Sequence, residues 1–83
     1  MFRNSLDELI DVLLNIKDKK EMKDFLLGIF TPKELLEIPT RLQIVKQLKK
    51  GIAQQKIAED LGVGIATVTR GSKEIQKGRF KTV

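Results

Sequence analysis

Residues 6–30 carry more large apolar side chains than two helices of a small monomer can easily bury. Thirteen of them are Leu, Ile, Val, Met or Phe, and those of the first half recur at spacings of three and one. This spacing places them on one wide face of a helix. Ser5 is expected to cap the first helix, with Glu8 completing a capping box, and Asp18 to cap the second. So large an apolar face predicts a core that two copies of the chain share.

The rest of the chain also has the helical period, and no stretch alternates apolar and polar residues as a strand does. Thr31–Glu34 is typical of a helix start, because Thr caps, Pro suits the first position and Glu closes a capping box. Pro39 is expected to end this short helix after Ile38. A second helix is then expected to begin at Thr40 and to end at Gly51. Its inward face is expected to consist of Leu42, Val45 and Leu48, with Ile44 at the flank. The predicted fold is all-α, with five to six helices.

Composition excludes several classes of function. The chain has no cysteine and no histidine, so a disulfide scaffold and a Cys/His zinc site are ruled out, and the commonest catalytic bases and nucleophiles are missing. No cluster of nucleophile, base and orienting group is present, so we expect no enzyme and no metal site. The apolar runs fall far short of the ~20 residues of a membrane span, and no signal peptide is seen. The expected compartment is the cytoplasm, without membrane contact.

Charge is distributed unevenly along the chain. Residues 1–40 hold six Lys/Arg and eight Asp/Glu, a net charge of −2, whereas residues 41–83 hold ten and three, a net charge of +7. A strongly basic half on a small domain is typical of contact with nucleic acid. A solvated basic surface is the alternative, and charge alone does not decide between the two.

The segment from Gln54 to Ile75 has the spacing of a helix-turn-helix. Gly62 falls where a tight turn requires positive φ, Val63 follows as an apolar plug, and Val68 is placed to pack back on the first helix. The inward face of the first helix consists of Ile57, Ala58 and Leu61. An ordinary helical hairpin is the alternative. In the functional interpretation the second helix enters the major groove and exposes Ile65, Ala66, Thr67, Thr69 and Lys73.

The string Gly64-Ile65-Ala66-Thr67-Val68-Thr69-Arg70-Gly71-Ser72 resembles the reading-helix signature of the bacterial Trp repressor family. Thr31-Pro32, Thr40-Arg41 and Ile44-Val45 match the family pattern at the right separations, so the resemblance covers roughly residues 26–75. The turn between Gly51 and Gln54 is one residue shorter, as in small Trp-repressor-like proteins of unassigned effector. The resemblance implies an intertwined homodimer that acts as a sequence-specific repressor on double-stranded operator DNA.

We therefore expect one Trp-repressor-like domain over residues 1–83. A dimerisation core is expected over 1–50, the helix-turn-helix over 51–76 and a basic tail over 77–83. From Gln76 onward the chain is polar, basic and interrupted by glycine, which predicts a frayed end. The Trp repressor continues into a further helix beyond the position of Val83, which implies a smaller shared core here.

The resemblance also implies a binding site for L-tryptophan as corepressor. The family holds this ligand between two arginine planes, and Arg41 and Arg70 are their counterparts; a guanidinium can stack on an indole or bind a carboxylate. The other matching pocket positions are Thr31, Val45, Thr67 and Gly71. Gly71 inside a helix costs about 1 kcal/mol relative to Ala, so either a ligand approaches closely there or the helix ends early. Arg41 could instead be solvated or bind a phosphate.

Two positions depart from the family's ligand site. Glu74 stands where the family has Ser, and a carboxylate there would repel the carboxylate of an amino acid, although it could attract the ammonium group. Gly28 replaces a leucine whose backbone carbonyl lines the pocket. The predicted ligand-binding residues are Thr31, Arg41, Val45, Thr67, Arg70, Gly71 and Glu74.

On the DNA side, the resemblance makes Ile65, Ala66 and Thr69 contact positions. Gln55 replaces a guanine-reading arginine, and because Gln prefers adenine, a different operator is expected. Phosphates would be held by Lys56, Lys73 and Lys77. The predicted DNA-binding residues are Gln54, Gln55, Lys56, Gly64, Ile65, Ala66, Thr67, Thr69 and Lys73.

Three hypotheses stay open. The first is a dimeric repressor with an amino-acid corepressor, which Arg41 and Arg70 favour. The second is a dimeric DNA-binding regulator of the same fold without a small ligand, which Glu74 favours. The third is a helical module whose basic face binds an acidic protein; the reading-helix string and the charge distribution disfavour it.

Overall fold

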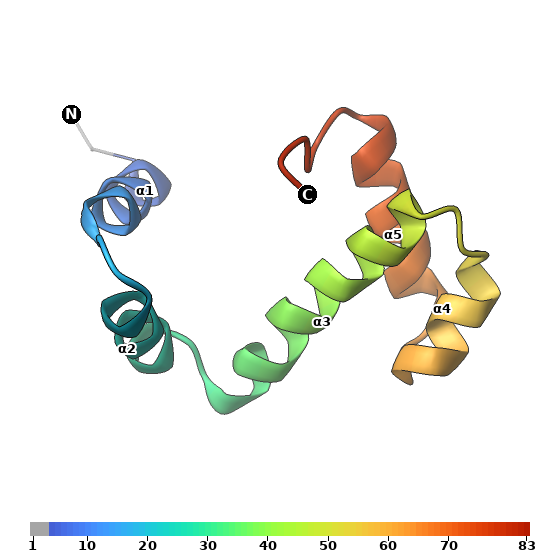
Figure 1. Cartoon of the computed structure of the whole chain (residues 1–83), viewed down its shortest axis with the longest axis horizontal. Coiled ribbons are helices and arrows are strands. Elements are labelled where there is room, and N and C mark those ends of the chain that lie inside the picture. The colour runs from blue at the N-terminus through green and yellow to red at the C-terminus, as the bar shows by residue number, and fades with distance from the viewer. Residues whose placement is uncertain (1–3) are drawn as a thin grey trace. The chain divides into compact units, whose positions relative to one another are not determined.

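The computed structural model describes residues 4–83, which form five α-helices and no strand (Figure 1). The helices are α1 (Ser5–Asn15), α2 (Lys19–Ile29), α3 (Pro32–Lys49), α4 (Gln54–Leu61) and α5 (Ile65–Gln76). The prediction of an all-α fold is confirmed. Contacts divide the described chain into two compact units, one that extends to Leu35 and one that begins at Leu36.

The N-terminal unit contains α1, α2 and the first turn of α3. Asn4 is the N-cap of α1, and its side-chain oxygen accepts a hydrogen bond from the Leu6 amide at 2.8 Å. The predicted cap at Ser5 is therefore wrong by one residue, because the preceding Asn is an equally good cap and Ser5 is already helical. Asp18 caps α2 as predicted, accepting from the Glu21 amide at 2.7 Å.

Large apolar side chains of this unit remain exposed in the single chain. Leu6, Leu14 and Leu27 are 60%, 77% and 54% exposed, and no described residue up to Leu35 is fully buried. Complete burial of one such side chain is worth about 1.5–3 kcal/mol. The folded single chain therefore leaves exposed much of the apolar surface that was noted in the sequence.

Helix α3 runs unbroken for 18 residues and contains Pro39, so the predicted division into two helices is wrong. A proline removes one backbone hydrogen bond, but the turns on either side continue the helix past it. Thr40, predicted to cap a new helix, instead donates its hydroxyl to the Leu36 carbonyl at 2.7 Å. The predicted capping box is confirmed: the Glu34 amide donates to the Thr31 hydroxyl at 3.2 Å, and the Thr31 amide donates to the Glu34 carboxylate at 2.9 Å.

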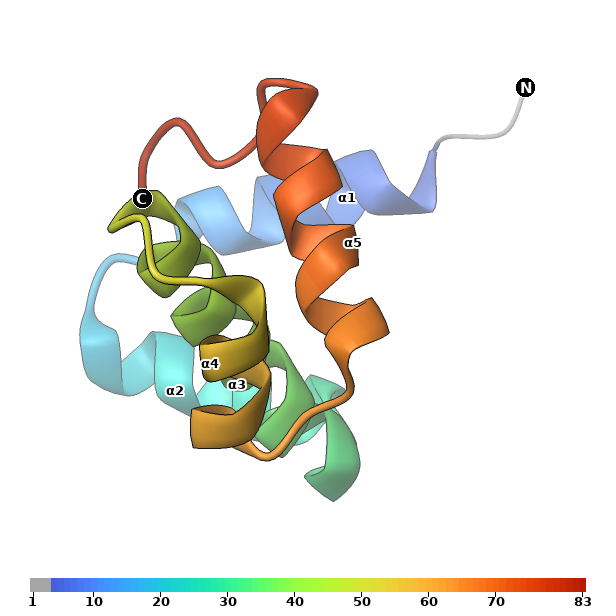
Figure 2. The same cartoon turned by 90° about the vertical axis from the view of Figure 1, so that its right-hand side faces the viewer.

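The core of the C-terminal unit lies where α4 and α5 pack against the second half of α3 (Figure 2). Ile44, Ile57 and Val68 are at most 1% exposed. The partly buried side chains around them are Leu48, Ile52, Leu61 and Val63. The inward residues predicted for the helix-turn-helix are confirmed. On α3, by contrast, Ile44 is central and Leu42 is 45% exposed, because α4 and α5 approach the helix from the side of Ile44.

The turn between α4 and α5 has the predicted geometry. Gly62 has a φ of +65°, a left-handed conformation that glycine adopts without steric cost. The Val63 amide donates to the Ala58 carbonyl at 3.0 Å, which closes a Schellman motif, and the Val63 side chain packs on the core. These contacts give the segment the backbone of a helix-turn-helix.

Candidate nucleic-acid interface and ligand pocket

The starts of α4 and α5 differ from those of the other helices in their capping. The N-cap residues Ala53 and Gly64 make no side-chain hydrogen bond to the helix, whereas Asn4, Asp18 and Thr31 cap α1, α2 and α3. The first amides of α4 and α5 therefore lack side-chain caps and lie at the positive end of each helix dipole. Such helix starts suit the phosphates of a nucleic acid.

The residues predicted to contact DNA lie at the start of α4 and along α5. The exposed ones are Gln55, Lys56, Gly64, Ile65, Ala66, Thr67 and Lys73. Gln54 and Thr69 are half-buried and joined, since the Thr69 hydroxyl donates to the Gln54 side-chain oxygen at 2.8 Å. Lys56 pairs with Asp60 at 3.4 Å, but both side chains are about half exposed. Exposed pairs of this kind are worth at most about 1 kcal/mol, so Lys56 remains available to a phosphate.

A cavity of about 330 Å³ lies between the second half of α3, helix α5 and the segment that follows α5. This volume is within the ~300–1,000 Å³ range of small-molecule sites. Its lining residues are Arg41, Ile44, Val45, Thr67, Arg70, Gly71, Glu74, Arg79 and Phe80. The structure thus brings together all predicted ligand-binding residues but Thr31. Thr31 belongs to the N-terminal unit, where its hydroxyl caps α3.

Gly71 lies inside α5, which continues to Gln76, so the alternative of an early helix end is wrong. A Cβ atom on Gly71 would lie 3.3 Å from Cγ2 of Ile44 and 3.4 Å from Cδ1 of Leu48. The missing side chain therefore allows α5 to pack closely on α3, a reason that the sequence did not show. The same absence leaves room in the cavity that Gly71 lines.

Arg41 and Arg70, the two arginines predicted to hold the ligand, both line the cavity. Arg41 also pairs with Glu37 on the preceding turn of α3, at 3.6 Å, with half of its side chain exposed. Because such a pair contributes little, a bound carboxylate or ring can engage this guanidinium at small cost.

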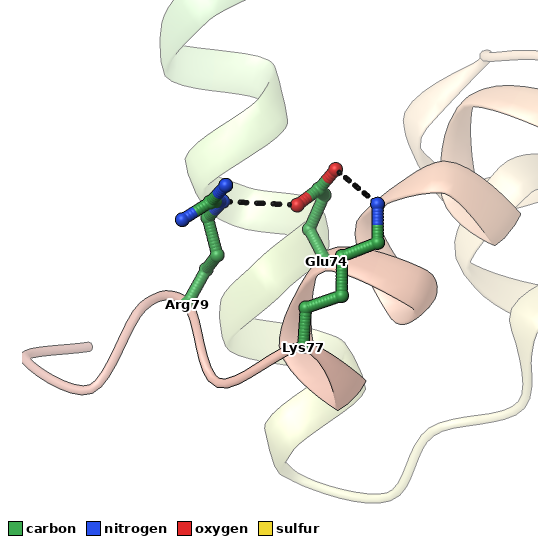
Figure 3. Close-up of polar contacts among 3 residues, drawn as sticks. All are labelled: Glu74, Lys77 and Arg79. Atoms are coloured by element: carbon green, nitrogen blue, oxygen red, sulfur yellow. Dashed lines mark hydrogen bonds and ion pairs between the residues drawn. The ribbon is translucent and has the colours of Figure 1, made fainter.

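Glu74 is held between two cations (Figure 3). Its carboxylate lies 3.5 Å from Lys77 Nζ and 3.1 Å from Arg79 Nε, and only 22% of its side chain is exposed. Burial by itself raises the pKa of Glu74, but the charges and hydrogen bonds of Lys77 and Arg79 outweigh it and lower the pKa below its ordinary value. Glu74 is therefore ionised at neutral pH, and its charge is compensated within the chain.

Arg79 and Phe80 are cavity residues that the sequence did not reveal. Gly78, with a φ of +92°, turns the chain back after α5, and the Arg79 amide donates to the Glu74 carbonyl at 3.1 Å. Lys49 at the end of α3 donates to the carbonyl oxygens of Phe80 and Val83. The predicted frayed end is wrong, because these bonds anchor it. The one available signal was a glycine two residues beyond Gln76, which is typical of a helix end.

These features define a class of protein: a helix-turn-helix on the basic half of the chain, with two uncapped helix starts and a cavity along the second helix. The profile of the family described as Trp repressor protein matches residues 4–81, so the chain belongs to this family. Members of this family are DNA-binding transcription regulators and not enzymes.

Curated relatives agree with this assignment. The Trp operon repressor homolog of Vibrio vulnificus (strain YJ016) is 37% identical over 70 residues, which cover 83% of this chain and 69% of the relative. That of Vibrio campbellii (strain ATCC BAA-1116) is 34% identical over 83 residues, covering 92% and 83%. No solved structure shows significant similarity. Within residues 4–83, no helix is both long and apolar enough to cross a membrane.

Proposed function

We propose that the protein is a homodimeric, sequence-specific repressor whose affinity for operator DNA is controlled by an aromatic amino acid, L-tryptophan in the first instance. The observation that carries the proposal is the place of the cavity, because α5 supplies both the predicted reading residues and one side of the cavity. Thr67, Arg70 and Gly71 line the cavity, and Ala66 and Thr69 lie on the same helix.

The chemistry of the cavity suits a flat zwitterion. Arg41 and Arg70 offer planar cations that can stack on an aromatic ring or bind a carboxylate in a bidentate manner. Ile44 and Val45, which are buried residues of α3 that line the cavity, supply apolar surface. Thr67 adds a hydroxyl group that can donate to or accept from the ligand.

Control of DNA binding follows from the two elements that the ligand would join. A molecule bound between α3 and α5 favours those orientations of α5 in which the cavity is intact. DNA affinity then changes through a shift in population of the reading helix. The coupling free energy expected for such control is about 1–3 kcal/mol, and it must act equally on ligand and DNA affinity.

The homodimer is supported by the N-terminal unit. Its exposed leucines, Leu14 at 77% above all, form an apolar surface that a second copy of the chain would cover. Helix-turn-helix dimers bind two half-sites about one DNA turn apart, so the operator should be palindromic.

Glu74 favours a second candidate, a regulator of the same fold without a small ligand. Its carboxylate lines the cavity, where it would repel the carboxylate of an amino acid unless Arg79 and Lys77 compensate its charge.

Calorimetric titration of the full chain with L-tryptophan distinguishes the candidates. Wild type should bind saturably, Arg70→Ala should bind at least about tenfold more weakly, and Lys20→Ala, which removes an exposed cation of α2, should bind as wild type does. The chain contains no Trp and no Tyr, so the fluorescence of bound tryptophan provides an independent measurement. If L-tryptophan, L-phenylalanine and L-tyrosine at millimolar concentration neither bind nor raise the melting temperature, the proposed control by an aromatic amino acid is wrong and the ligand-free candidate is favoured.

A further inference from the structure

The segment that follows α5, residues 78–83, is fixed against α3 and α5 by bonds at both of its ends, and we refer to it as the C-terminal strap. Figure 2 shows it returning from the end of α5 toward the end of α3. The Arg79 amide donates to the Glu74 carbonyl at 3.1 Å, and Lys49 donates to the carbonyl oxygens of Phe80 and, at 3.1 Å, Val83.

The backbone of Phe80 has a conformation that its surroundings must hold. Its φ is +62°, the only positive value at a non-glycine residue among residues 4–83. Bulky residues rarely adopt this conformation, and it persists where neighbouring contacts determine it. Within the strap the Val83 amide donates to the Phe80 carbonyl at 3.2 Å, so the same oxygen is bonded from α3 and from the strap.

The second and third residues of the strap, Arg79 and Phe80, both line the cavity. Phe80 is 38% exposed and lines a cavity of about 330 Å³, so there is room for a ligand beside this residue. Arg79 places its Nε 3.1 Å from the Glu74 carboxylate, while Lys77 reaches the other carboxylate oxygen from outside the cavity lining (Figure 3).

We propose that the C-terminal strap is part of the ligand-binding site. Phe80 supplies an aromatic surface for the ring of an aromatic amino acid, and Arg79, together with Lys77, offsets the charge of Glu74 so that the ligand's carboxylate is accepted. This inference rests on the proposed control by an aromatic amino acid. It explains how a carboxylate at position 74 is compatible with an amino-acid site: Arg79 compensates locally for the charge that Glu74 introduces.

A double-mutant cycle at Glu74 and Arg79 tests the charge compensation. L-tryptophan binding would be measured by calorimetry for Arg79→Ala, Glu74→Gln and the double variant. Arg79→Ala should weaken binding about tenfold or more, Glu74→Gln should leave it unchanged or tighter, and the double variant should return to within about threefold of wild type. If the ion pair only holds the strap in place, both single variants weaken binding alike and the double variant does not recover.

Phe80 is tested by Phe80→Ala and Phe80→Leu, with Lys81→Ala as a control in the strap outside the cavity lining. Phe80→Leu keeps an apolar side chain, so a loss of binding in both variants with unchanged melting temperatures reports the aromatic ring itself. Wild-type affinity in Phe80→Ala and Arg79→Ala would overturn the role of the strap alone. Failure of wild type to bind any aromatic amino acid would instead overturn the proposed control, and this inference with it.

Discussion

The hydroxyl group of Thr69 on α5 donates a hydrogen bond to the side-chain oxygen of Gln54, the first residue of α4, at 2.8 Å. Both residues were predicted to contact DNA, and the bond links them across the helix-turn-helix. Because the amide oxygen of Gln54 is occupied by Thr69, its NH₂ group remains as a donor for a phosphate or a base acceptor.

Thr69→Ala should change base preference by about 1–3 kcal/mol per lost contact, rather than weaken binding to every sequence. The substitution removes any direct contact of Thr69 and also frees the Gln54 amide to rotate. Binding to a randomised DNA pool would measure the effect. Gln54→Ala should alter preference at overlapping positions of the site; an equal loss on all sequences in both variants would exclude α5 as the reading helix.

Lys56→Ala should lower DNA affinity uniformly and reduce the slope of log affinity against log salt by about 1, as expected for the loss of one phosphate contact. Because its ion pair with Asp60 is exposed and weak, this pair does not prevent Lys56 from binding a phosphate. Filter-binding or anisotropy titrations at several salt concentrations measure the slope. Lys20→Ala, on α2, is the matched control; an unchanged slope for Lys56→Ala would place this lysine away from the DNA.

Gly71→Ala should destabilise the protein, whereas Gly28→Ala should stabilise it. A Cβ at Gly71 meets Ile44 and Leu48 at 3.3 and 3.4 Å, and overpacking of such a contact costs about 1–3 kcal/mol, more than the ~1 kcal/mol gained in helix propensity. A Cβ at Gly28 meets nothing within 4 Å. Both variants make the same chemical change inside a helix. The difference between their melting temperatures therefore separates the cost of overpacking from the gain in helix propensity. Stabilisation by both would show that α5 can shift away from α3.

Acidification should weaken the start of α3. The hydrogen bonds from the Thr31 amide and then from its hydroxyl group lower the pKa of Glu34. A lowered pKa in the folded state adds stability above the ordinary pKa of the carboxyl group, and this contribution is lost as the pH falls through the lowered pKa. Glu34→Gln can keep the capping box but cannot titrate. Its melting temperature should therefore fall less than that of wild type between neutral and strongly acidic pH; parallel curves would contradict this assignment.

Leu14→Asp should dissociate or unfold the protein at micromolar concentration, although Leu14 is 77% exposed in the single chain. A substitution at a truly exposed site changes stability by no more than about 0.5 kcal/mol, but a charge in a shared core costs several. Sedimentation and thermal melts at several protein concentrations measure both effects. Asn15→Asp adds the same charge to the neighbouring position as a control. A wild-type monomer, or a variant as stable as wild type, would contradict the shared core.

The sequence predicted several features that depend on near neighbours, although the cap of α1 is Asn4 and not Ser5. The capping box at Thr31 and Glu34, the turn at Gly62 and the inward face of α4 are set within a few residues, and all were predicted. Pro39 was misjudged because a proline usually ends a helix, and the continuation of α3 depends on packing of the turns beyond it.

Contacts between distant residues could not be read in the same way. Lys49 binds the carbonyl of Phe80, 31 positions later, through backbone atoms that every residue possesses. The burial of Ile44 and the exposure of Leu42 likewise depend on the side of α3 against which α4 and α5 pack. Six of the predicted ligand residues could be placed together only through the family resemblance, since Arg41 and Arg70 lie on different helices.

Helix α5 carries its two sets of residues at separate phases of its 3.6-residue period. The cavity residues Thr67, Arg70, Gly71 and Glu74 recur at spacings of three, one and three, and each of Ala66, Thr69 and Lys73 comes one position before a cavity residue and so lies on the adjacent face of the helix. Thr67 belongs to both predicted sets, and the other residues divide between two faces of the same helix. Under the proposed control by an aromatic amino acid, substitutions at 66 and 69 would redirect the regulator to new operators with the same ligand, and substitutions at 70 and 74 would place the same operators under a new ligand.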